Sequence, residues 1–301
     1  MKTMKRILNL AGVAVLLSAS TVWGQILLPN SQPDPAFNGN AMQVWLRADS
    51  GVTTTGGAVS DWQDRSNNNN DATQSNADDQ PTHATGSFGG RQVVNFAAGR
   101  DYLDFGTDFA STFQGSFTVF SLLAPADGQP SGDRVIFGTV NSEDRVVIAH
   151  DLDRLNHLYK ENKNSANTNI TTGSFPDGAQ TQFTLFSYVN TAGGTHYVYK
   201  DGNPAAVASV DGSGVTNANF ALSGTDTNAW LGMANSGDGT PWLNAARSYQ
   251  GGIAEFIIYD GALSVADREA VEDYVLNYIP EPASCVLLAL GCLGLVSRRR
   301  R

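Results

Sequence analysis

The chain has 301 residues, 41% of them hydrophobic, and a formal net charge of −10 from 19 basic and 29 acidic side chains. This length allows one large domain or two small ones, and the apolar content excludes a wholly disordered chain. An acidic chain without a basic stripe repels phosphate, so nucleic acid is excluded as a partner.

The N-terminus has the three parts of a secretory signal. Basic residues precede an apolar run at 7–19, and Val22-Trp23-Gly24 puts small or modest residues at the positions that a signal peptidase reads. We therefore predict a signal peptide over 1–24, with the cut between Gly24 and Gln25. The alternative, an uncleaved anchor helix, is disfavoured because the apolar run is short for a membrane span.

The middle of the chain has the pattern of an all-β protein. Residues 25–40 are rich in proline and are predicted to be a linker. From residue 41 onward, short apolar runs of period two alternate with Gly, Asn, Asp and Ser clusters. These predict strands at 42–47, 59–63, 92–96, 117–123, 134–140, 145–149, 183–189, 196–200, 205–210, 229–233 and 252–259. Many strands without βαβ alternation predict an antiparallel two-sheet jelly-roll β-sandwich.

One helix, 264–279, is predicted to pack on the sandwich. Ser264 is a suitable N-cap, and Asp267 follows three residues later, as in a capping box. An apolar stripe at three-to-four spacing consists of Val271, Tyr274, Val275 and Tyr278. The helix ends the predicted domain, 41–279, before Pro280.

The C-terminal segment, 280–301, has three parts. Pro280, Glu281 and Pro282 come first, and an apolar helix over 283–296 follows. At 1.5 Å per residue this helix is about 21 Å long, which is shorter than a membrane core of about 30 Å. The chain then ends on Arg298, Arg299, Arg300 and Arg301.

This order of parts resembles the PEP-CTERM sorting signal of Gram-negative bacteria. In that family an exosortase-type protease removes the tail near the Pro-Glu-Pro motif, so the resemblance implies export, only transient membrane anchoring, and release to the cell surface or the extracellular biofilm matrix. The alternative is a retained membrane anchor. Both cysteines, Cys285 and Cys292, lie in this tail, so the processed chain would have no disulfide.

A second resemblance covers roughly 41–279. The segments that carry it, in order, are VWLRAD at 44–49, DWQDRS at 61–66, NDA at 70–72, VVNF at 93–96, YKDG at 199–202 and GIAEFIIY at 252–259. They resemble the LamG-like jelly-roll domain of the concanavalin A-like superfamily. The resemblance implies a two-sheet sandwich, a frequent calcium ion at its rim, and ligand binding rather than catalysis.

Catalytic motifs are not found in the sequence. Glycoside hydrolysis needs two carboxylates about 5–10 Å apart, and enzymes with this sandwich place them in a Glu-x-Asp-x-Glu run that the chain lacks. No Gly-x-Ser-x-Gly motif is present either. We therefore predict a protein that is not an enzyme. Glu255 is expected to pair with an arginine such as Arg268 or Arg247, and Glu269 and Glu272 are expected to be solvated.

No cofactor is required, but calcium is the ion that the abundant Asp and Asn residues favour. The candidate ligands are Asp101, Asp104, Asp151 and Asp153. The alternative is that these residues supply turns.

Carbohydrate binding would use an exposed aromatic side chain beside polar groups. Trp242, in a turn-rich loop, and Tyr159, beside His157, are the candidates, whereas Trp45, Trp62 and Trp230 are predicted to be buried. We therefore expect a non-catalytic binding or adhesion module for extracellular polysaccharide or matrix. The alternatives are a glycoside hydrolase or lyase with an atypical site, and a purely structural matrix component.

Overall fold

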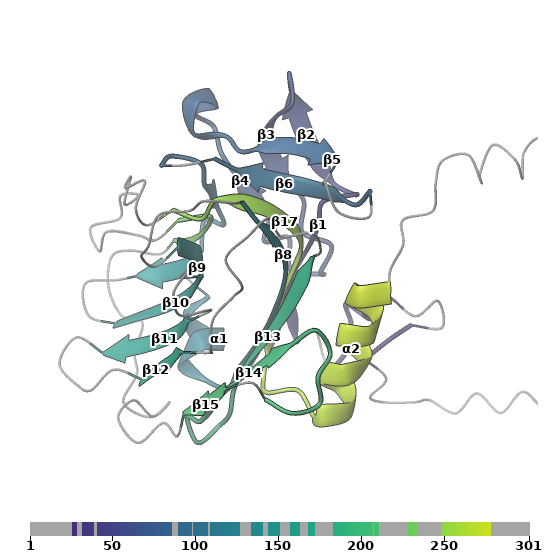
Figure 1. Ribbon diagram of the computed structural model, residues 1–301, viewed down its shortest axis with the longest axis vertical. Coiled ribbons are helices and arrows are strands. Elements are labelled where there is room, and N and C mark those ends of the chain that lie inside the picture. Colours follow the sequence, from purple (N-terminus) through teal and green to yellow (C-terminus); the bar gives the residue numbers. More distant parts are fainter. Residues whose placement is uncertain are drawn as a thin grey trace, which may run out of the picture.

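The computed structural model describes most of the chain between residues 26 and 277. The described residues are 26–28, 32–38, 41–85, 90–97, 99–107, 109–126, 134–140, 144–150, 157–162, 168–171, 183–206, 208–210, 228–233 and 248–277. The protein is mostly β, with antiparallel strands in one curled sheet and a helix near the C-terminus (Figure 1). The predicted signal and sorting segments, 1–24 and 280–301, lie outside the described residues.

Curling of the sheet places two groups of strands opposite each other, which we name the back layer and the front layer (Figure 1). The back layer runs in the order β1 (Met42–Arg47), β17 (Gly251–Asp260), β8 (Phe117–Pro125), β13 (Thr184–Asn190), β14 (His196–Lys200) and β15 (Ala208–Val210).

The front layer runs in the order β2 (Val52–Thr55), β3 (Ala58–Trp62), β4 (Ala72–Thr73), β7 (Leu103–Asp104), β16 (Ala229–Leu231), β9 (Arg134–Val140), β10 (Asp144–His150), β11 (His157–Asn162) and β12 (Thr168–Thr171). Strands β5 (Thr82–Thr85) and β6 (Gln92–Phe96) connect the two layers, since β3 pairs with β5, β5 with β6 and β6 with β17.

The main hydrophobic core lies between the layers. Phe137 of the front layer stacks on Phe256 of the back layer, with ring centroids 5.6 Å apart. The short helix α1 (Ala110–Gln114) adds Phe113, whose ring lies edge-on to Phe117. Because side chains alternate along a strand, every second residue of each layer points away from this core.

Helix α2 (Val265–Asn277) covers the outer face of the back layer (Figure 1). Its start confirms the predicted cap: the Asp267 amide donates to Ser264 Oγ at 3.2 Å, and Ser264 Oγ donates to Asp267 at 2.7 Å. The predicted apolar stripe is buried at Val271, Tyr274 and Val275. At the other end, Arg91 donates two hydrogen bonds of 2.8 Å to the last-turn carbonyls of Val275 and Leu276.

The predicted strands agree well with the observed ones where the sequence pattern is apolar. Four agree residue for residue, namely β1, β6, β9 and β14, and the other seven predicted strands correspond to observed strands with somewhat different ends. The unpredicted strands β2, β4, β5, β7, β11 and β12 are short or polar, and tertiary pairing holds them in the sheet. Helix α1 and the 3₁₀ turn η1 (Ala77–Asp79) also went unpredicted, because so few residues show no helical period.

The chain before β1 packs on the same outer face as α2. Ile26 is buried there, and the Phe37 ring meets Tyr259 edge-on at 6.4 Å. These residues lie within the segment predicted as a linker. In the part of the chain that the structure describes, no helix has both the length and the apolar character that crossing a bilayer requires.

Candidate ligand-binding face

The outer face of the front layer carries one continuous row of residues across six strands. Asp61 pairs with Thr73, Thr73 with Asp104, Asp104 with Trp230, Trp230 with Gly138, and Gly138 with Val147. We name this set the outer row.

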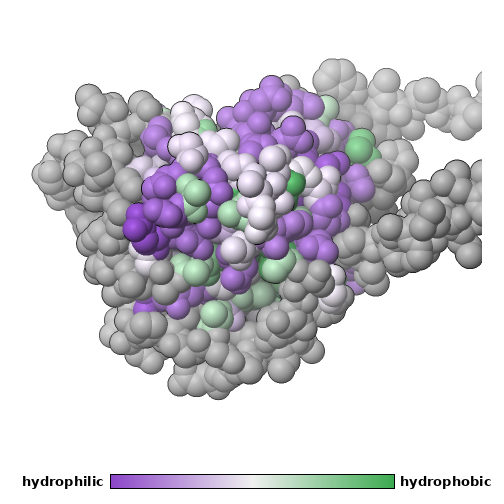
Figure 2. Space-filling view, turned by 90° about the horizontal axis from the view of Figure 1, so that it is seen from above, coloured by the Kyte–Doolittle hydropathy of each residue, from purple (hydrophilic) through white to green (hydrophobic). Residues whose placement is uncertain are grey.

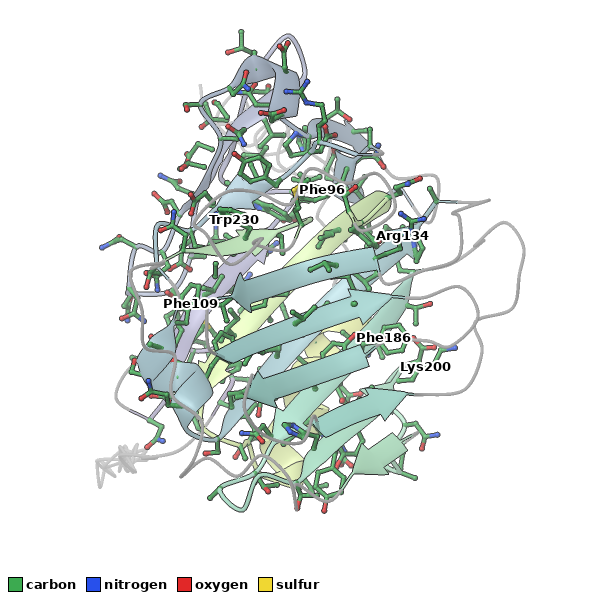
Figure 3. The ribbon with its side chains drawn as sticks, turned by 90° about the vertical axis from the view of Figure 1, so that its left-hand side faces the viewer. Phe96, Phe109, Arg134, Phe186, Lys200 and Trp230 are labelled. Atoms are coloured by element: carbon green, nitrogen blue, oxygen red, sulfur yellow. The ribbon has the colours of Figure 1, made fainter. Side chains whose placement is uncertain are left out.

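The orientation of the outer row follows from its chain neighbours. Each residue of the outer row has a sequence neighbour that belongs to the core between the layers. In the order of the row these neighbours are Trp62, Ala72, Leu103, Leu231, Phe137 and Val146. Since successive side chains of a strand point to opposite faces, the outer row points away from the core. Figure 3 views this layer face on and labels Trp230.

The two carboxylates of the outer row differ in the hydrogen bonds that they accept from the protein. Asp104 accepts hydrogen bonds from the Gly106 amide at 2.7 Å and from Asn228 Nδ2 at 2.8 Å. Within the described part of the chain, Asp61 accepts one long hydrogen bond, 3.4 Å, from Thr53 Oγ1. Partial burial and the nearby charge of Asp71 raise the pKa of Asp61. An ionised carboxylate has about four acceptor positions, so Asp61 can receive further donors from outside the protein.

Trp230 is the large aromatic residue of the outer row. Its ring lies 5.4 Å from that of Tyr102, at 47°, and only 2% of its surface is exposed. Burial was predicted for Trp45, Trp62 and Trp230 and is confirmed for all three. Trp62 Nε1 donates to the Arg47 carbonyl and Trp45 Nε1 donates to Glu255. Among the described residues, Trp230 Nε1 has no hydrogen-bond acceptor.

Gly232 sets the position of Trp230 by ending β16. It has a φ of +90°, and a Cβ there would overlap the Phe96 ring and lie 2.9 Å from the Asp101 carbonyl. Glycine has no Cβ, so it alone can take this positive φ here without a steric clash. The Gly232 amide also donates to the Ile136 carbonyl of β9 at 2.7 Å, which holds the end of β16 against the front layer.

Strand β11 brings two predicted ligand-binding residues to the same layer. Tyr159 pairs by register with Val147, and His157 pairs with Ala149. Val147, Ala149 and Val135 form a small buried cluster apart from the main core. Three predicted site residues that lie far apart in the sequence, Asp104, Tyr159 and His157, therefore stand on one layer of the sheet.

The predicted calcium ligands do not assemble in the described residues. Asp101 accepts a hydrogen bond of 2.7 Å from the Ala97 amide, and burial raises its pKa. No group of three or more His, Cys, Asp or Glu side chains with metal-binding geometry occurs in the described part of the chain. Asp151, Asp153 and the candidate sugar-binding Trp242 lie outside it, so calcium binding stays a prediction.

The polar loop after β3 has a structural role. Asp64 accepts hydrogen bonds from the amides of Trp45, Ser66 and Asn70 at 2.8–2.9 Å. Asn68 and Asn70 donate to the β1 carbonyls of Met42 and Gln43 at 2.7 and 2.8 Å. The motif residues at 64–71 thus attach this loop to the start of β1.

The glutamate expectations have different outcomes. Glu255 accepts a hydrogen bond of 2.7 Å from Trp45 Nε1, and the arginines whose charges act on it are Arg47 and Arg91, since Arg268 pairs with Glu272 at 2.6 Å and Arg247 lies outside the described residues. Glu272 was expected to be solvated, but it and Arg268 are each 1% exposed because α2 presses both against the back layer. Burial raises the pKa of Glu255 to about 7, with the Trp45 hydrogen bond and Arg47 acting in the opposite direction.

Comparisons with known proteins identify a fold and no family. No protein-family model matches the sequence, and no curated protein matches it significantly. The binding domain of botulinum neurotoxin DC, solved in complex with rat synaptotagmin II, has a TM-score of 0.54 at 13% identity over 79% of this chain. The same domain in complex with SialylT gives 0.52 at 13% identity over 79% of this chain.

The binding domain of Paraclostridial Mosquitocidal Protein 1 is similar to a comparable degree, with a TM-score of 0.53 at 10% identity over 78% of this chain. The chain spans about half of each of these structures, 52% of their length. At such low identity the similarity establishes a shared β fold.

Proposed function

We propose that this protein binds extracellular polysaccharide, without catalysis, through the outer face of the front layer. The observation that carries the proposal is the half-buried ring of Tyr102, which lies on the buried Trp230 next to the end of the outer row that holds Thr73 and the carboxylates of Asp61 and Asp104. Sugars present apolar ring faces and many hydroxyl groups, so their binding sites combine aromatic rings with a few polar side chains.

The fold supports a binding role. The described chain is similar to three solved structures of toxin binding domains, one of them in complex with SialylT. We assign the domain to the LamG-like jelly-roll group on its sequence motifs. The loop at 64–71, which carries two of these motifs, attaches to β1 and so has a defined place in the fold.

The binding test compares two tyrosines on opposite sides of the molecule. Tyr102→Ala removes the ring that contacts Trp230, and Tyr197→Ala removes a half-buried ring that stacks on Tyr199 in the back layer. We expect retention on immobilised polysaccharides to fall at least about tenfold for Tyr102→Ala and to stay unchanged for Tyr197→Ala. Equal retention by Tyr102→Ala and wild type, with both folded by circular dichroism, would contradict the site.

A glycan-active enzyme is the second candidate, and one observation favours it. Asp61 and Asp104 stand two strands apart on one face, a separation of about 10 Å, near the range of inverting glycosidases. Incubation with each bound polysaccharide, followed by measurement of new reducing ends, separates the candidates. Binding without new reducing ends supports the binding module, whereas turnover that Asp61→Asn abolishes supports the enzyme.

We further propose that the chain is exported and processed at both ends. A signal peptidase would cut after Gly24, and an exosortase-type protease would remove the tail from about Pro280, leaving the domain at the surface or in the matrix of a Gram-negative bacterium. Intact-mass measurement of protein from cells and from medium tests this. A released species that begins at Gln25 and lacks Arg298–Arg301 supports processing, and a membrane-held chain with all four arginines contradicts it.

A further inference from the structure

We propose that Arg100 is the hydrogen-bonding part of the sugar site, and that it binds two adjacent hydroxyl groups of a sugar ring that rests on Tyr102. The inference rests on the proposed binding function and deepens it, because it names a residue that contacts the ligand and the class of polysaccharide that fits. It follows from how the protein holds the Arg100 guanidinium, from the donors left on it, and from its position next to Tyr102.

The Arg100 side chain is fixed at one edge and exposed at the other. Its Nε donates to Asp79 Oδ1 at 2.7 Å, yet 54% of the side chain is exposed. Asp79 is 8% exposed and is fixed in turn by Asn76, whose Nδ2 donates to its other carboxylate oxygen at 2.6 Å. A buried acid that is itself hydrogen-bonded restricts the arginine to one orientation, so binding a ligand costs less conformational entropy.

The outward edge of the guanidinium keeps its donors. Arginine has five N–H donors, and in the described part of the chain Arg100 uses the one on Nε. Between Nη1 and Nη2 the planar group presents two parallel N–H bonds, which match two oxygen atoms that lie side by side. Adjacent hydroxyls of a pyranose ring provide such a pair of oxygens.

Tyr102 lies next to this guanidinium because both residues contact Asp79. The Tyr102 amide donates to the Asp79 carbonyl at 3.2 Å, while the Asp79 carboxylate binds Arg100. The Tyr102 ring is half-buried and lies 5.4 Å from that of Trp230. A sugar has apolar ring faces and carries its hydroxyls around the rim, so a ring on Tyr102 would direct hydroxyls toward a donor at its side.

The loop that carries both residues is tied down on either side of Arg100. The Gly99 amide donates to the buried Ser248 Oγ at 2.9 Å, and the Ala97 amide donates to Asp101 Oδ2 at 2.7 Å. These bonds hold the loop in the absence of a ligand. The site is therefore formed before binding, which favours affinity.

The surrounding charges favour a hydroxyl pair over a carboxylate as the ligand group. Asp79 already offsets the charge of Arg100, and the acids Asp78 and Asp101 are the chain neighbours of this ion pair. A carboxylate would meet these acids, whereas a hydroxyl pair requires parallel donors and no net positive charge.

This requirement separates polysaccharides by their linkage. Internal units of a 1,4-linked mannan or glucan keep two adjacent free hydroxyls, at C2 and C3 of each ring. Internal units of a linear 1,3-linked β-glucan have free hydroxyls at C2 and C4, which are not adjacent. We therefore expect the protein to bind 1,4-linked chains in preference to 1,3-linked ones.

The experiment measures binding isotherms of the full chain on immobilised polymers. The set consists of a linear 1,4-linked mannan, a 1,4-linked glucan, a linear 1,3-linked β-glucan and polygalacturonate, which adds a carboxylate to a 1,4-linked chain. At least one of the two neutral 1,4-linked polymers should bind about tenfold more tightly than the 1,3-linked glucan. Equal binding of the 1,3-linked glucan, or tight binding of polygalacturonate alone, would overturn the preference for a hydroxyl pair.

Two variants of Arg100 test the parallel donors. Arg100→Ala should weaken binding of the preferred polymer at least about tenfold, because both hydrogen bonds are lost. Arg100→Lys keeps the charge but cannot present two parallel N–H bonds, so it should remain at least about fivefold weaker than wild type. Arg65→Lys is the matched control at an exposed arginine, whose Cζ lies 5.5 Å from the centre of the Trp45 ring, and it should change nothing.

Asp79 is a positioning residue that acts through Arg100, and a double-variant cycle tests this role. Asp79→Asn should weaken binding in the wild-type chain but change it by less than about twofold in Arg100→Ala. A merely structural role for Asp79 would instead weaken binding by the same factor in both backgrounds.

The outcomes separate this inference from the proposed function. Full binding by Arg100→Ala, together with weakened binding by Tyr102→Ala, would overturn the inference and leave the proposed site in place. Full binding by Tyr102→Ala, or absence of binding to every polymer, would overturn the proposed function itself. Weakened binding in both alanine variants, without rescue by Arg100→Lys, would support the inference.

Discussion

The two layers of the sheet have outer faces of opposite character. Strand residues of the back layer present Trp45, Leu122, Ile257 and Tyr259, which α2 covers together with Ile26, Leu27 and Phe37. At the β3–β4–β7 end of the front layer the corresponding positions hold Asp61, Thr73 and Asp104, of which Thr73 is exposed and both acids are half-buried, whereas Trp230, Gly138 and Val147 further along the outer row are buried. Figure 2 looks down on the end of the molecule that holds β2, β3, β5 and β6, where hydrophilic patches surround neutral and weakly hydrophobic ones.

The difference predicts that the two layers contribute unequally to stability and to the proposed binding. Both layers use alternate residues to build the shared core, so their outer residues are free to differ. Apolar outer residues gain free energy when a helix covers them, whereas polar outer residues do not and remain available to a ligand. The back layer therefore stabilises the molecule, and we expect its substitutions to affect unfolding while those of the front layer affect affinity.

The largest expected effect comes from the buried ion pair beneath α2. Arg268→Ala should reduce the free energy of unfolding by about 3–5 kcal/mol, because Glu272 would be left charged and buried. The guanidinium also lies 3.7 Å from the centre of the Tyr199 ring, so stacking is lost as well. Denaturant unfolding measures the change.

The matched control for this pair is a double substitution. Arg268→Met with Glu272→Leu removes both charges and should cost much less than Arg268→Ala alone. Equal losses for the single and the double variants would show that packing, and not the unpaired charge, explains the effect.

The next effect is a pH dependence caused by Glu255. Its ordinary pKa is 4.5, and burial raises it to about 7 in the folded protein. Between these values the folded state keeps a proton that the unfolded state releases, so stability falls as the pH rises from 4.5 to 7, by about 3 kcal/mol. Glu255→Gln should flatten this part of the stability curve, and an unchanged slope in that variant would refute the assignment.

A smaller effect is expected where the N-terminal segment covers the back layer. Ile26→Ala should reduce the free energy of unfolding by about 2 kcal/mol, because Ile26 is buried against this face. Leu28→Ala, two residues away and 36% exposed, is the control and should change it by less than about 0.5 kcal/mol. Equal effects at both positions would mean that this segment does not cover the layer as described.

The smallest effect on stability belongs to the front layer. Asp61→Asn should change the free energy of unfolding by no more than about 0.5 kcal/mol, since Asp61 has a single long hydrogen bond and a pKa already raised. Thermal melts without a ligand measure the stability of the variant. Melts with a bound polysaccharide measure its binding, because a ligand that binds only the folded state raises the melting temperature. A large loss of stability in Asp61→Asn without a ligand would show that Asp61 stabilises the fold. It would contradict the expectation that substitutions in the front layer affect affinity and not unfolding.

Particular residues show which parts of this picture could be predicted from sequence. The cap at Ser264, the stripe at Val271, Tyr274 and Val275, and the burial of Trp45 depend on spacing of a few residues, so local patterns were sufficient. Glu272 was misjudged because helical position alone does not say which face meets the sheet. Trp230 was correctly predicted to be buried, but the sequence could not place it in a row with Asp61, which lies far earlier in the chain.

The sequence by itself determined the strand-rich class and the helix near the C-terminus, because periodicity and capping are local properties of the chain. Only the tertiary structure decided which strands share a layer, which face α2 covers, and which residues meet across the strands. Strand register joins residues that are far apart in sequence, from Asp61 to Val147, and periodicity of two carries no information about partners. The candidate ligand-binding face is therefore a product of register, and it became visible only once the strands were paired.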